Sequence, residues 1–255
     1  MAKVWGDSSR GRIGTFWGND PSLVGYWQLN GNSLDNSGNS NNGTDASVIY
    51  GGPFGKFGKG AYFNGTNSLI TTPLTSISVS SKTVMAWVKT STTTYQVICA
   101  QWAPPASWNL GINNDSLNSG ILEFSTFNGT TSIFSKSSAP SLATGNWTHV
   151  AATYDSSNYA ISFYVNGVLS GTATGNQSQS STVGVGIGRE NQTTIYGPYS
   201  GYLDEVAIFS RVLSASEISQ YYNWAIGGNQ RKHIFGKIIA IINYGASLLS
   251  QLMTQ

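Results

Sequence analysis

Carboxylates are the first side chains to consider for chemistry, because paired acids can cleave glycosidic bonds. A retaining glycosidase needs two carboxyl groups about 5–5.5 Å apart. Residues two apart on one β-strand share a face at a spacing of about 6.6–7 Å, so a short E-x-D-x-x-E run would supply such a pair. The eleven Asp and Glu residues are scattered and form no such run, and the adjacent Asp204 and Glu205 are expected on opposite faces of one strand. The sequence therefore predicts no catalytic carboxylate pair.

The histidines and the cysteine do not indicate a nucleophilic centre. His149 lies in the middle of a β-rich run, and we interpret it as a structural side chain. His233 lies in a basic run, where we expect solvent to reach it. Neither stands near a G-x-S-x-G nucleophile motif. Cys99 is the only cysteine, which excludes an internal disulfide, and its setting V-I-C-A predicts a small buried apolar side chain.

Aromatic side chains near loops are the candidates for binding a carbohydrate. A sugar ring stacks on an aromatic side chain only if that side chain is exposed, and buried aromatics are the commoner case. The segment A-P-P-A at residues 103–106 provides a stiff connection between two tryptophans. The candidate carbohydrate-binding residues are Trp102, Trp108, Tyr196 and Tyr199.

The segment WTHVAATYDSSNYAISFYVNG, which ends at Gly167, predicts consecutive antiparallel strands. Residues 147–154 alternate large and small side chains with the period of two that a sheet imposes. Residues 155–158 supply Asp, Ser and Asn, whose side chains can bond their own backbone in a turn. The chain returns as residues 159–165 and turns again at Asn166-Gly167, a strong hairpin signal. We expect this β-meander at the centre of a sheet.

Short β-branched and aromatic runs recur along the chain between Gly, Ser, Asn and Pro turns. Glycine alternates with apolar residues in the run 183–188, which predicts close approach by another backbone. The remaining predicted strands are 23–29, 83–90, 95–102, 121–127, 131–135, 168–174 and 201–209. This pattern, with 12% aromatic residues in 255, predicts one all-β sandwich rather than a disordered chain. The net charge is only +2 and no basic stripe appears, so nucleic acid is not an expected partner.

Several ordered motifs resemble the laminin G-like, concanavalin A-like lectin and glucanase jelly rolls. The hairpin motif W-T-H-V-A-x-T-Y-D, followed by Y-V-N-G, is similar to the central hairpin of that family, which also places a histidine at His149. The opening V-G-Y-W-x-L, followed by D-x-S-G-N-x-N-N-G-T, is similar as well. The segment 58–65 resembles G-x-A-x-x-F-D-G, with Asn64 in place of aspartate. The resemblance covers residues 23–225 and implies an antiparallel jelly-roll β-sandwich.

Calcium is the cofactor to which the residues and the resemblance point. Ca²⁺ takes about six to eight oxygen ligands, and a loop can supply carboxylates, amides and backbone carbonyls. Asp35 and Asn36 stand in such a loop. Related jelly rolls hold calcium between the opening loop and the closing strand, which pairs Asp35 with Asp204 as metal ligands. The alternative is that Asp35 only caps a turn, and Asn64 in place of aspartate favours that alternative.

The chain divides into an N-terminal arm at 1–22, a jelly-roll domain at 23–226, and a linker with a C-terminal amphipathic helix at 227–255. The arm is predicted to be extended, because its composition cannot bury a core. Ser214 and Glu217 form a capping-box pattern that predicts a short helix before the Gly-Gly pair.

The C-terminal segment carries apolar residues at spacings of three and four, and a second apolar stripe lies beside the first. The first stripe contains Ile234, Ile238, Ile241, Leu248 and Leu252. So wide an apolar face needs a partner, and polar residues interrupt a stretch barely long enough to span a membrane. We expect oligomerisation through this helix. The alternatives are packing on its own sandwich and contact with an anionic membrane surface.

These observations favour a non-enzymatic structural or surface protein. We expect a subunit of a larger assembly, such as a virion decoration or fibre or a surface filament. The arm and the C-terminal helix are expected to bind either further copies of this chain or other subunits of the assembly. The N-terminus has no apolar signal-peptide core, so we expect the protein at a virion or cell surface without a cleavable signal. The alternative is a glycan-binding adhesion module, and a glycoside hydrolase is the third hypothesis.

Overall fold

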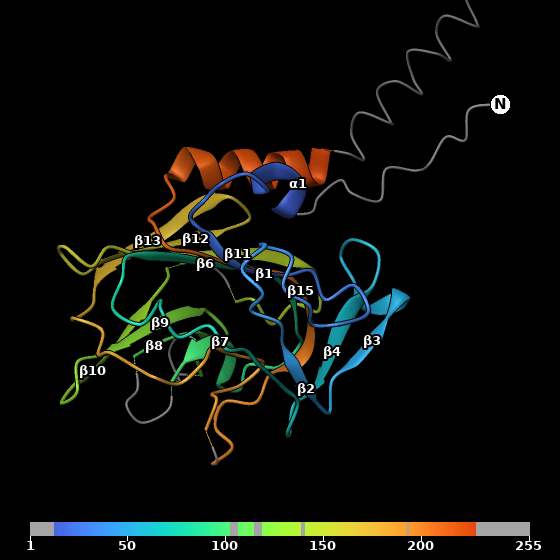
Figure 1. The fold of residues 1–255 in the computed structure, drawn as a ribbon, viewed down its shortest axis with the longest axis horizontal. Coiled ribbons are helices and arrows are strands. Elements are labelled where there is room, and N and C mark those ends of the chain that lie inside the picture. Colours follow the sequence, from blue (N-terminus) through green and yellow to red (C-terminus); the bar gives the residue numbers. More distant parts are fainter. Residues whose placement is uncertain (1–12, 103–106, 115–118, 139–140, 193, 228–255) are drawn as a thin grey trace, which may run out of the picture.

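The computed structural model describes residues 13–102, 107–114, 119–138, 141–192 and 194–227 of the 255-residue chain. Within these ranges the chain forms two antiparallel sheets that pack face to face as a sandwich (Figure 1). The eight-stranded sheet has the order β13-β12-β11-β6-β15-β4-β3, with β1 paired to β15. The seven-stranded sheet has the order β10-β9-β8-β7-β14-β5-β2. The predicted all-β antiparallel sandwich is therefore confirmed.

Tight turns and longer loops connect the elements. The helical ones are α1 (Ile13–Trp17), the 3₁₀ turn η1 (Gly52–Phe54) and a helix over residues 215–227. The strands are β1 (Leu23–Trp27), β2 (Thr44–Ala46), β3 (Ile49–Gly51), β4 (Gly60–Asn64), β5 (Leu69–Thr71), β6 (Lys82–Lys89), β7 (Gln96–Gln101), β8 (Trp108–Ile112), β9 (Leu122–Phe127), β10 (Ser132–Lys136), β11 (Thr148–Tyr154), β12 (Ala160–Val165), β13 (Val168–Thr174), β14 (Gly186–Ile187) and β15 (Ser200–Phe209).

The predicted meander is confirmed as β11, β12 and β13, which form one end of the eight-stranded sheet. The side chains of Val150 and Val165 stand opposite each other in the β11–β12 register. Asn166 and Gly167 have φ angles of 50° and 76°, as the tight turn between β12 and β13 requires. The strand β6, rather than the meander, occupies the middle of the sheet.

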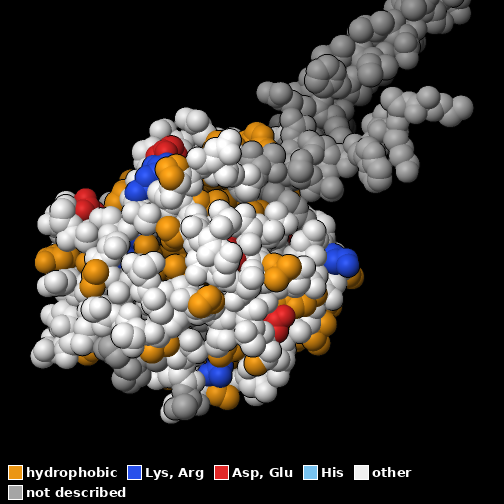
Figure 2. Space-filling model, viewed as in Figure 1, with side chains coloured by type: hydrophobic (Ala, Val, Ile, Leu, Met, Phe, Trp, Pro, Cys, Tyr) orange, Lys and Arg blue, Asp and Glu red, His pale blue; other side chains and the backbone are white. Residues whose placement is uncertain are grey.

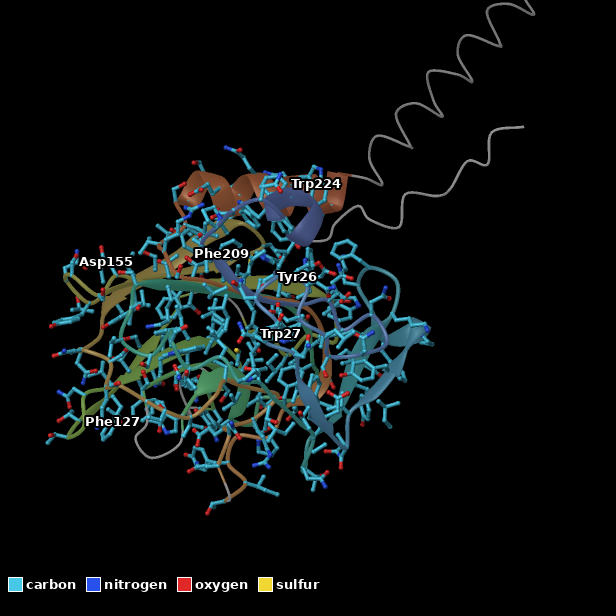
Figure 3. The ribbon with its side chains drawn as sticks, viewed as in Figure 1. Tyr26, Trp27, Phe127, Asp155, Phe209 and Trp224 are labelled. Carbon is cyan, nitrogen blue, oxygen red and sulfur yellow. The ribbon has the colours of Figure 1, made fainter. Side chains whose placement is uncertain are left out.

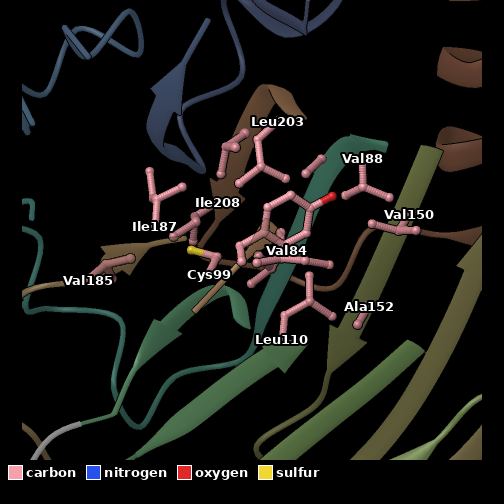
Figure 4. Packing of buried hydrophobic residues seen from close by; sticks show 14 of the residues in the cluster. Val84, Val88, Cys99, Leu110, Val150, Ala152, Val185, Ile187, Leu203 and Ile208 are labelled. Atoms are coloured by element: carbon pink, nitrogen blue, oxygen red, sulfur yellow. The ribbon is translucent and has the colours of Figure 1, made fainter. Parts of the chain in front are cut away.

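The main core lies between the two sheets, where alternate side chains of both inner faces meet. Figure 4 shows apolar side chains of the eight-stranded sheet, such as Val84 and Leu203, converging on Cys99 and Leu110 of the seven-stranded sheet. The predicted burial of Cys99 is confirmed, since none of its surface is exposed. The glycine-rich run at β14 packs as predicted: a Cβ on Gly184 would lie 1.7 Å from the carbonyl oxygen of Thr72.

A second apolar cluster covers the outer face of the eight-stranded sheet. The α1 helix and the helix over residues 215–227 lie together on this face (Figure 1). The rings of Phe16 and Trp224 are 5.4 Å apart, and those of Trp17 and Tyr221 are 5.0 Å apart. Tyr26 belongs to this cluster, whereas its neighbour Trp27 packs between the sheets (Figure 3).

The expectation of an extended arm over residues 1–22 is wrong for its described part. Ile13, Phe16 and Trp17 stand at helical spacing, and this apolar face packs on the sheet instead of lying in solvent. The backbone N–H of Ile13 donates to the Glu205 carboxylate at 2.8 Å. Asp20 forms an ion pair with Arg211 at 2.6 Å. Residues 13–22 are therefore part of the folded domain.

Asp204 and Glu205 were expected on opposite faces of one strand. A β-bulge in β15 makes this prediction wrong. The register of β15 shifts after Asp204, and Glu205 has a φ of 54°. Asp204 accepts hydrogen bonds from the backbone of Lys56 and Phe57, while Glu205 accepts one from the Tyr26 hydroxyl. Phe57 and Tyr26 both belong to the cluster beneath the helices, so both carboxylates lie on that side of the strand.

Candidate functional site

The outer face of the seven-stranded sheet carries a groove. Its larger part has a volume of about 550 Å³ and is lined by residues before β7, on β9 and β10, and in the loop before β15. A second part of about 280 Å³ adds residues that follow β7 and β14. Tyr95, Phe134 and Tyr196 line both parts, so the two form one continuous groove.

Four aromatic side chains form the apolar surface of this groove. Phe134 and Tyr196 are 54% and 55% exposed, and Tyr95 and Trp102 are partly exposed. Tyr95 and Trp102 directly flank β7, which places one at each end of that strand. The rings of Tyr95 and Tyr196 are 5.3 Å apart and inclined at 49°. The groove therefore presents aromatic surface from several elements to one ligand.

Loop geometry brings Tyr196 against the sheet. The amide of Val97 donates to the carbonyl oxygen of Gly197 at 2.8 Å, which fixes the loop on β7. Gly197 has a φ of 59°, and a Cβ there would lie 2.6 Å from Val97 and 2.7 Å from Tyr95. Glycine is therefore required for Tyr196 to reach the groove.

Two buried carboxyl groups, Glu123 and Glu190, lie at the base of the groove. They are 5% and 1% exposed, respectively. The Ser125 hydroxyl donates to Glu123 at 3.0 Å, and the Gln192 amide donates to Glu190. Burial raises the pKa of Glu123 to about 7 and that of Glu190 to about 8. Both groups are therefore largely protonated in mildly acidic solution.

Two buried asparagines, Asn109 and Asn113, adjoin residues that line the groove. The Asn109 amide donates to the Tyr95 hydroxyl at 2.6 Å, which orients the tyrosine ring over the sheet. Asn113 is 1% exposed, and neither atom of its side-chain amide has a hydrogen-bond partner in the structure. Its neighbour Asn114 lines the groove. Such an arrangement of aromatic surface with a few placed polar groups is typical of small-ligand sites.

Two of the four predicted carbohydrate-binding aromatics reach the groove, and two do not. Trp102 and Tyr196 line it. The prediction is wrong for Trp108 and Tyr199, which have no exposed surface. Trp108 begins β8 and stacks on Phe124 in the core, with ring centroids 6.1 Å apart and planes at 3°.

No sequence motif singled out the other groove residues. Tyr95 and Phe134 stood within predicted strands, and Glu123 and Glu190 are 67 positions apart. The pairing of β9 with β10 brings these residues together, because Phe134 stands opposite Ser125 and Lys136 stands opposite Glu123. The alternation of polar and apolar residues along β9 was the available signal, because it marks one face as leaving the core.

The surroundings of Asp35 do not fit a calcium ion. Its Oδ1 accepts the backbone N–H groups of Tyr26 and Ser37 at 2.9 and 2.8 Å. Its Oδ2 accepts the Ser37 hydroxyl and the Asn41 N–H at 2.9 and 2.8 Å. A carboxylate offers about four acceptor positions, and these donors use them. Asp35 therefore caps the opening loop.

Asp204 accepts hydrogen bonds from the N–H groups of Lys56 and Phe57, a different set of donors from those around Asp35. Among the described residues, no group of three or more His, Cys, Asp or Glu side chains is arranged to hold a metal. Calcium binding through Asp35 and Asp204 stays a prediction, and the donor sets argue against it.

His149 is fully buried between Trp87 and Tyr221, with ring centroids 5.4 and 5.2 Å away. Neither of its nitrogens has a hydrogen-bond partner, and burial lowers its pKa to about 3. A neutral imidazole packed among aromatic rings agrees with the structural role expected from the sequence.

The five oligomerisation residues from Ile234 to Leu252 lie outside the described part of the chain, as does His233. Among the helices that the structure describes, none is both long enough and apolar enough to cross a membrane. On the face of the domain drawn in Figure 2, most of the surface is backbone and side chains that are neither apolar nor charged, with scattered apolar patches and few charged side chains.

The fold and the sequence motifs define a lectin-like β-sandwich. The chain belongs to the concanavalin A-like lectin/glucanases superfamily, whose family model matches residues 64–219. The family resemblance of the sequence is thereby confirmed. A comparison with curated protein sequences found no match.

Solved structures share this fold at low sequence identity. Domain 4 of AbnA, a GH43 extracellular arabinanase from Geobacillus stearothermophilus solved in complex with arabinotriose, is 22% identical with a TM-score of 0.64, over 79% of this chain and 98% of that one. The binding domain of Paraclostridial Mosquitocidal Protein 1 is 16% identical with a TM-score of 0.65, over 79% and 52%. The Botulinum Neurotoxin Type G receptor binding domain is 16% identical with a TM-score of 0.58, over 80% and 54%. The chain thus spans about half of each toxin domain.

Proposed function

We propose that this domain is a non-catalytic glycan-binding module and that the aromatic groove on the seven-stranded sheet is its binding site. The observation that carries this proposal is the convergence of four partly exposed aromatic rings over buried polar side chains. A sugar ring has an apolar C–H face that stacks on aromatic surface and hydroxyl groups that hydrogen-bond to polar side chains. The groove offers both kinds of contact.

The neighbouring folds support the same reading. One was solved in complex with arabinotriose, one is the binding domain of a mosquitocidal protein, and one is the receptor binding domain of a neurotoxin. Because these structures are less than 25% identical to this chain, they support a lectin-like use of the fold and leave the ligand of this groove to its own residues.

The two groove carboxyl groups do not show the opposite pKa shifts that glycoside hydrolysis needs. Catalysis by paired acids requires one protonated group and one ionised group, which their environments must hold apart in pKa. Here burial raises the pKa of both Glu123 and Glu190. We therefore expect no release of reducing sugar, and release that Glu123→Gln or Glu190→Gln abolishes would contradict a non-catalytic role.

The test of glycan binding compares aromatic variants of the groove with a matched surface variant. We expect Tyr196→Ala and Phe134→Ala each to weaken binding by about five- to thirtyfold, since a stacked ring contributes about 1–2 kcal/mol. Val168→Ala is the control, because Val168 is an exposed apolar residue on β13, outside the groove. Affinities are measured by titration calorimetry with the tightest ligand from a glycan array. Equal affinity of all three variants would overturn the assignment of the groove.

Display of this domain by a larger assembly, such as a virion or a surface filament, is the wider role that we propose. The positions of the two ends of the described chain support this role. Both ends of the described chain, at Ile13 and Gly227, belong to elements on the helix-covered face of the eight-stranded sheet, whereas the groove lies on the opposite sheet. Attachment through the terminal segments would leave the groove facing outward.

A further inference from the structure

The groove contains two buried acids whose hydrogen-bond donors are neutral. Among the described residues, the donor to Glu123 is the Ser125 hydroxyl and the donor to Glu190 is the Gln192 amide. Each of these donors engages one oxygen of its carboxyl group, Oε1 of Glu123 and Oε2 of Glu190. Within the described chain, no donor is recorded for the second oxygen of either carboxyl, and a ligand hydroxyl in the groove can serve as its partner.

We propose, resting on the glycan-binding function above, that the groove takes a neutral oligosaccharide and that binding takes up protons on Glu123 and Glu190. In this state each carboxylic acid donates its O–H to a hydroxyl or ring oxygen of the sugar. The aromatic rings hold the apolar faces of consecutive sugar units.

Two basic residues stand next to the acids, one on β10 and one after β14. Lys136 of β10 stands opposite Glu123 of β9 and lines the same part of the groove. Arg189 is next to Glu190 and directs its guanidinium to the carbonyl oxygens of Glu190 and Gln192, at 3.4 and 3.1 Å. The Tyr95 hydroxyl lies near both acids, and burial and their charges raise its pKa.

The direction of the proton linkage follows from burial. With pKa values of about 7 and 8, the two acids ionise progressively between pH 6 and pH 9 in the free protein. A sugar stacked on the groove removes their remaining contact with water, which disfavours the ionised form further. A ligand that prefers the protonated form must bind less tightly as the pH rises. The loss reaches at most about tenfold per pH unit for each acid.

A neutral ligand fits this base better than an anionic one above neutral pH. A sialic acid or sulfate group would add negative charge beside two acids that have begun to ionise, and like charges in a poorly solvated site repel strongly. Hydroxyl groups carry no such penalty and can accept from the protonated acids.

The experiment measures affinity from pH 5.5 to pH 9 by titration calorimetry. The probe is whichever of arabinotriose, xylotriose, cellotriose, maltotriose and lactose binds most tightly. We expect constant affinity up to about pH 6.5 and at least a tenfold loss by pH 9. Titrations at pH 7.5 in buffers of different ionisation enthalpy should show net proton uptake. Lactose and 3′-sialyllactose form a matched pair, and sialyllactose should bind less tightly at pH 8.

Glu123→Gln, Glu190→Gln and their combination replace each protonated acid by a neutral amide of similar shape. We expect the affinity of these variants to lose its pH dependence, most completely in the double variant. Asp45→Asn, at an exposed position of β2, is the control and should keep the wild-type profile.

The outcomes separate this inference from the function on which it rests. A pH profile that is flat in the wild type, or unchanged in the double variant, overturns proton-linked binding while glycan binding stands. Tighter binding of sialyllactose than of lactose at pH 8 overturns the neutral ligand class. If Tyr196→Ala and Phe134→Ala leave the affinity unchanged, or if no oligosaccharide binds at any pH, the proposed function itself is wrong.

Discussion

At the residue scale, burial decides the chemistry more than residue type does. Glu123, Glu190 and Lys82 are ionisable side chains almost without exposed surface. The glutamates lie under the groove, whereas Lys82 lies in the interior, with its ammonium 4.4 Å from the centre of the Tyr154 ring. The order of acidic and basic residues along the chain does not predict such burial, because the strand register determines which groups surround each ionisable side chain.

Lys82 provides a prediction for stability against pH. Burial lowers its pKa from 10.5 to about 7 in the folded protein. Between these values the unfolded chain binds more protons, so this group makes the free energy of unfolding rise with pH over about 7 to 10. Lys82→Met keeps the volume and removes the charge. We expect a higher melting temperature than wild type at pH 6 and a difference that shrinks toward pH 10.

Calorimetry of both proteins at pH 6, 8 and 10 measures this difference directly, since all other titrating groups are shared. The competing effect is loss of the Lys82 contact with the Ser78 carbonyl oxygen at 3.3 Å. If that contact dominates, the variant will melt below wild type at every pH, and the burial argument for Lys82 is wrong.

At the element scale, the strands with regular alternation were predictable and those without it were not. The meander of β11 to β13 followed from alternation and from the Asn-Gly turn. The strand β8, Trp108–Ile112, was missed because its outward positions hold Asn109 and Gly111, which resemble a loop in sequence. The bulge at Glu205 was also beyond prediction, because an inserted residue leaves no mark in the pattern.

The α1 helix was missed for a different reason. An isolated helix this short does not form in water, so only its packing on the sheet explains it. The capping box at Ser214 and Glu217 was predictable, and it is confirmed by the bonds from Ser214 N to Glu217 Oε2 and from Glu217 N to Ser214 Oγ, at 2.7 and 3.3 Å.

The docking of α1 predicts that Trp17 stabilises the whole domain. Its ring packs 5.1 Å from Phe209 and 5.0 Å from Tyr221, and only 8% of it is exposed. We expect Trp17→Ala to lower the free energy of unfolding by about 3–5 kcal/mol in urea denaturation. Phe134→Ala, an exposed aromatic position, should change it by less than about 0.5 kcal/mol. A loss of similar size in both variants would contradict the distinction between core and groove.

At the scale of the whole molecule, the outer faces of the two sheets differ in what covers them. The helices cover the eight-stranded sheet, while the groove lies on the seven-stranded sheet. Trp102 and Tyr196 were predicted from the sequence, but most of the groove could not be, because it is assembled across strands and a loop rather than from one motif. The role of residues 228–255 stays a prediction.

Truncation after Gly228 tests that prediction. We expect light scattering to show a larger assembly for the full chain and a monomer for the truncated chain, because the apolar stripes of the tail need a partner. Liposome flotation distinguishes a membrane surface from a second subunit. The glycan affinity of each groove should be unchanged by the truncation. Monomers in both cases, with neither floating, would mean that the tail serves its own domain.

The central claim, that the groove binds glycan, is tested most directly by an NMR titration of the ¹⁵N-labelled protein with its tightest oligosaccharide. We expect shift changes concentrated at the amides of Tyr95, Glu123, Phe134, Tyr196 and Gly197, which line the groove, and none at Tyr222 in the helix over residues 215–227. Changes concentrated instead around the Asp35 loop or on the helix-covered face would contradict it.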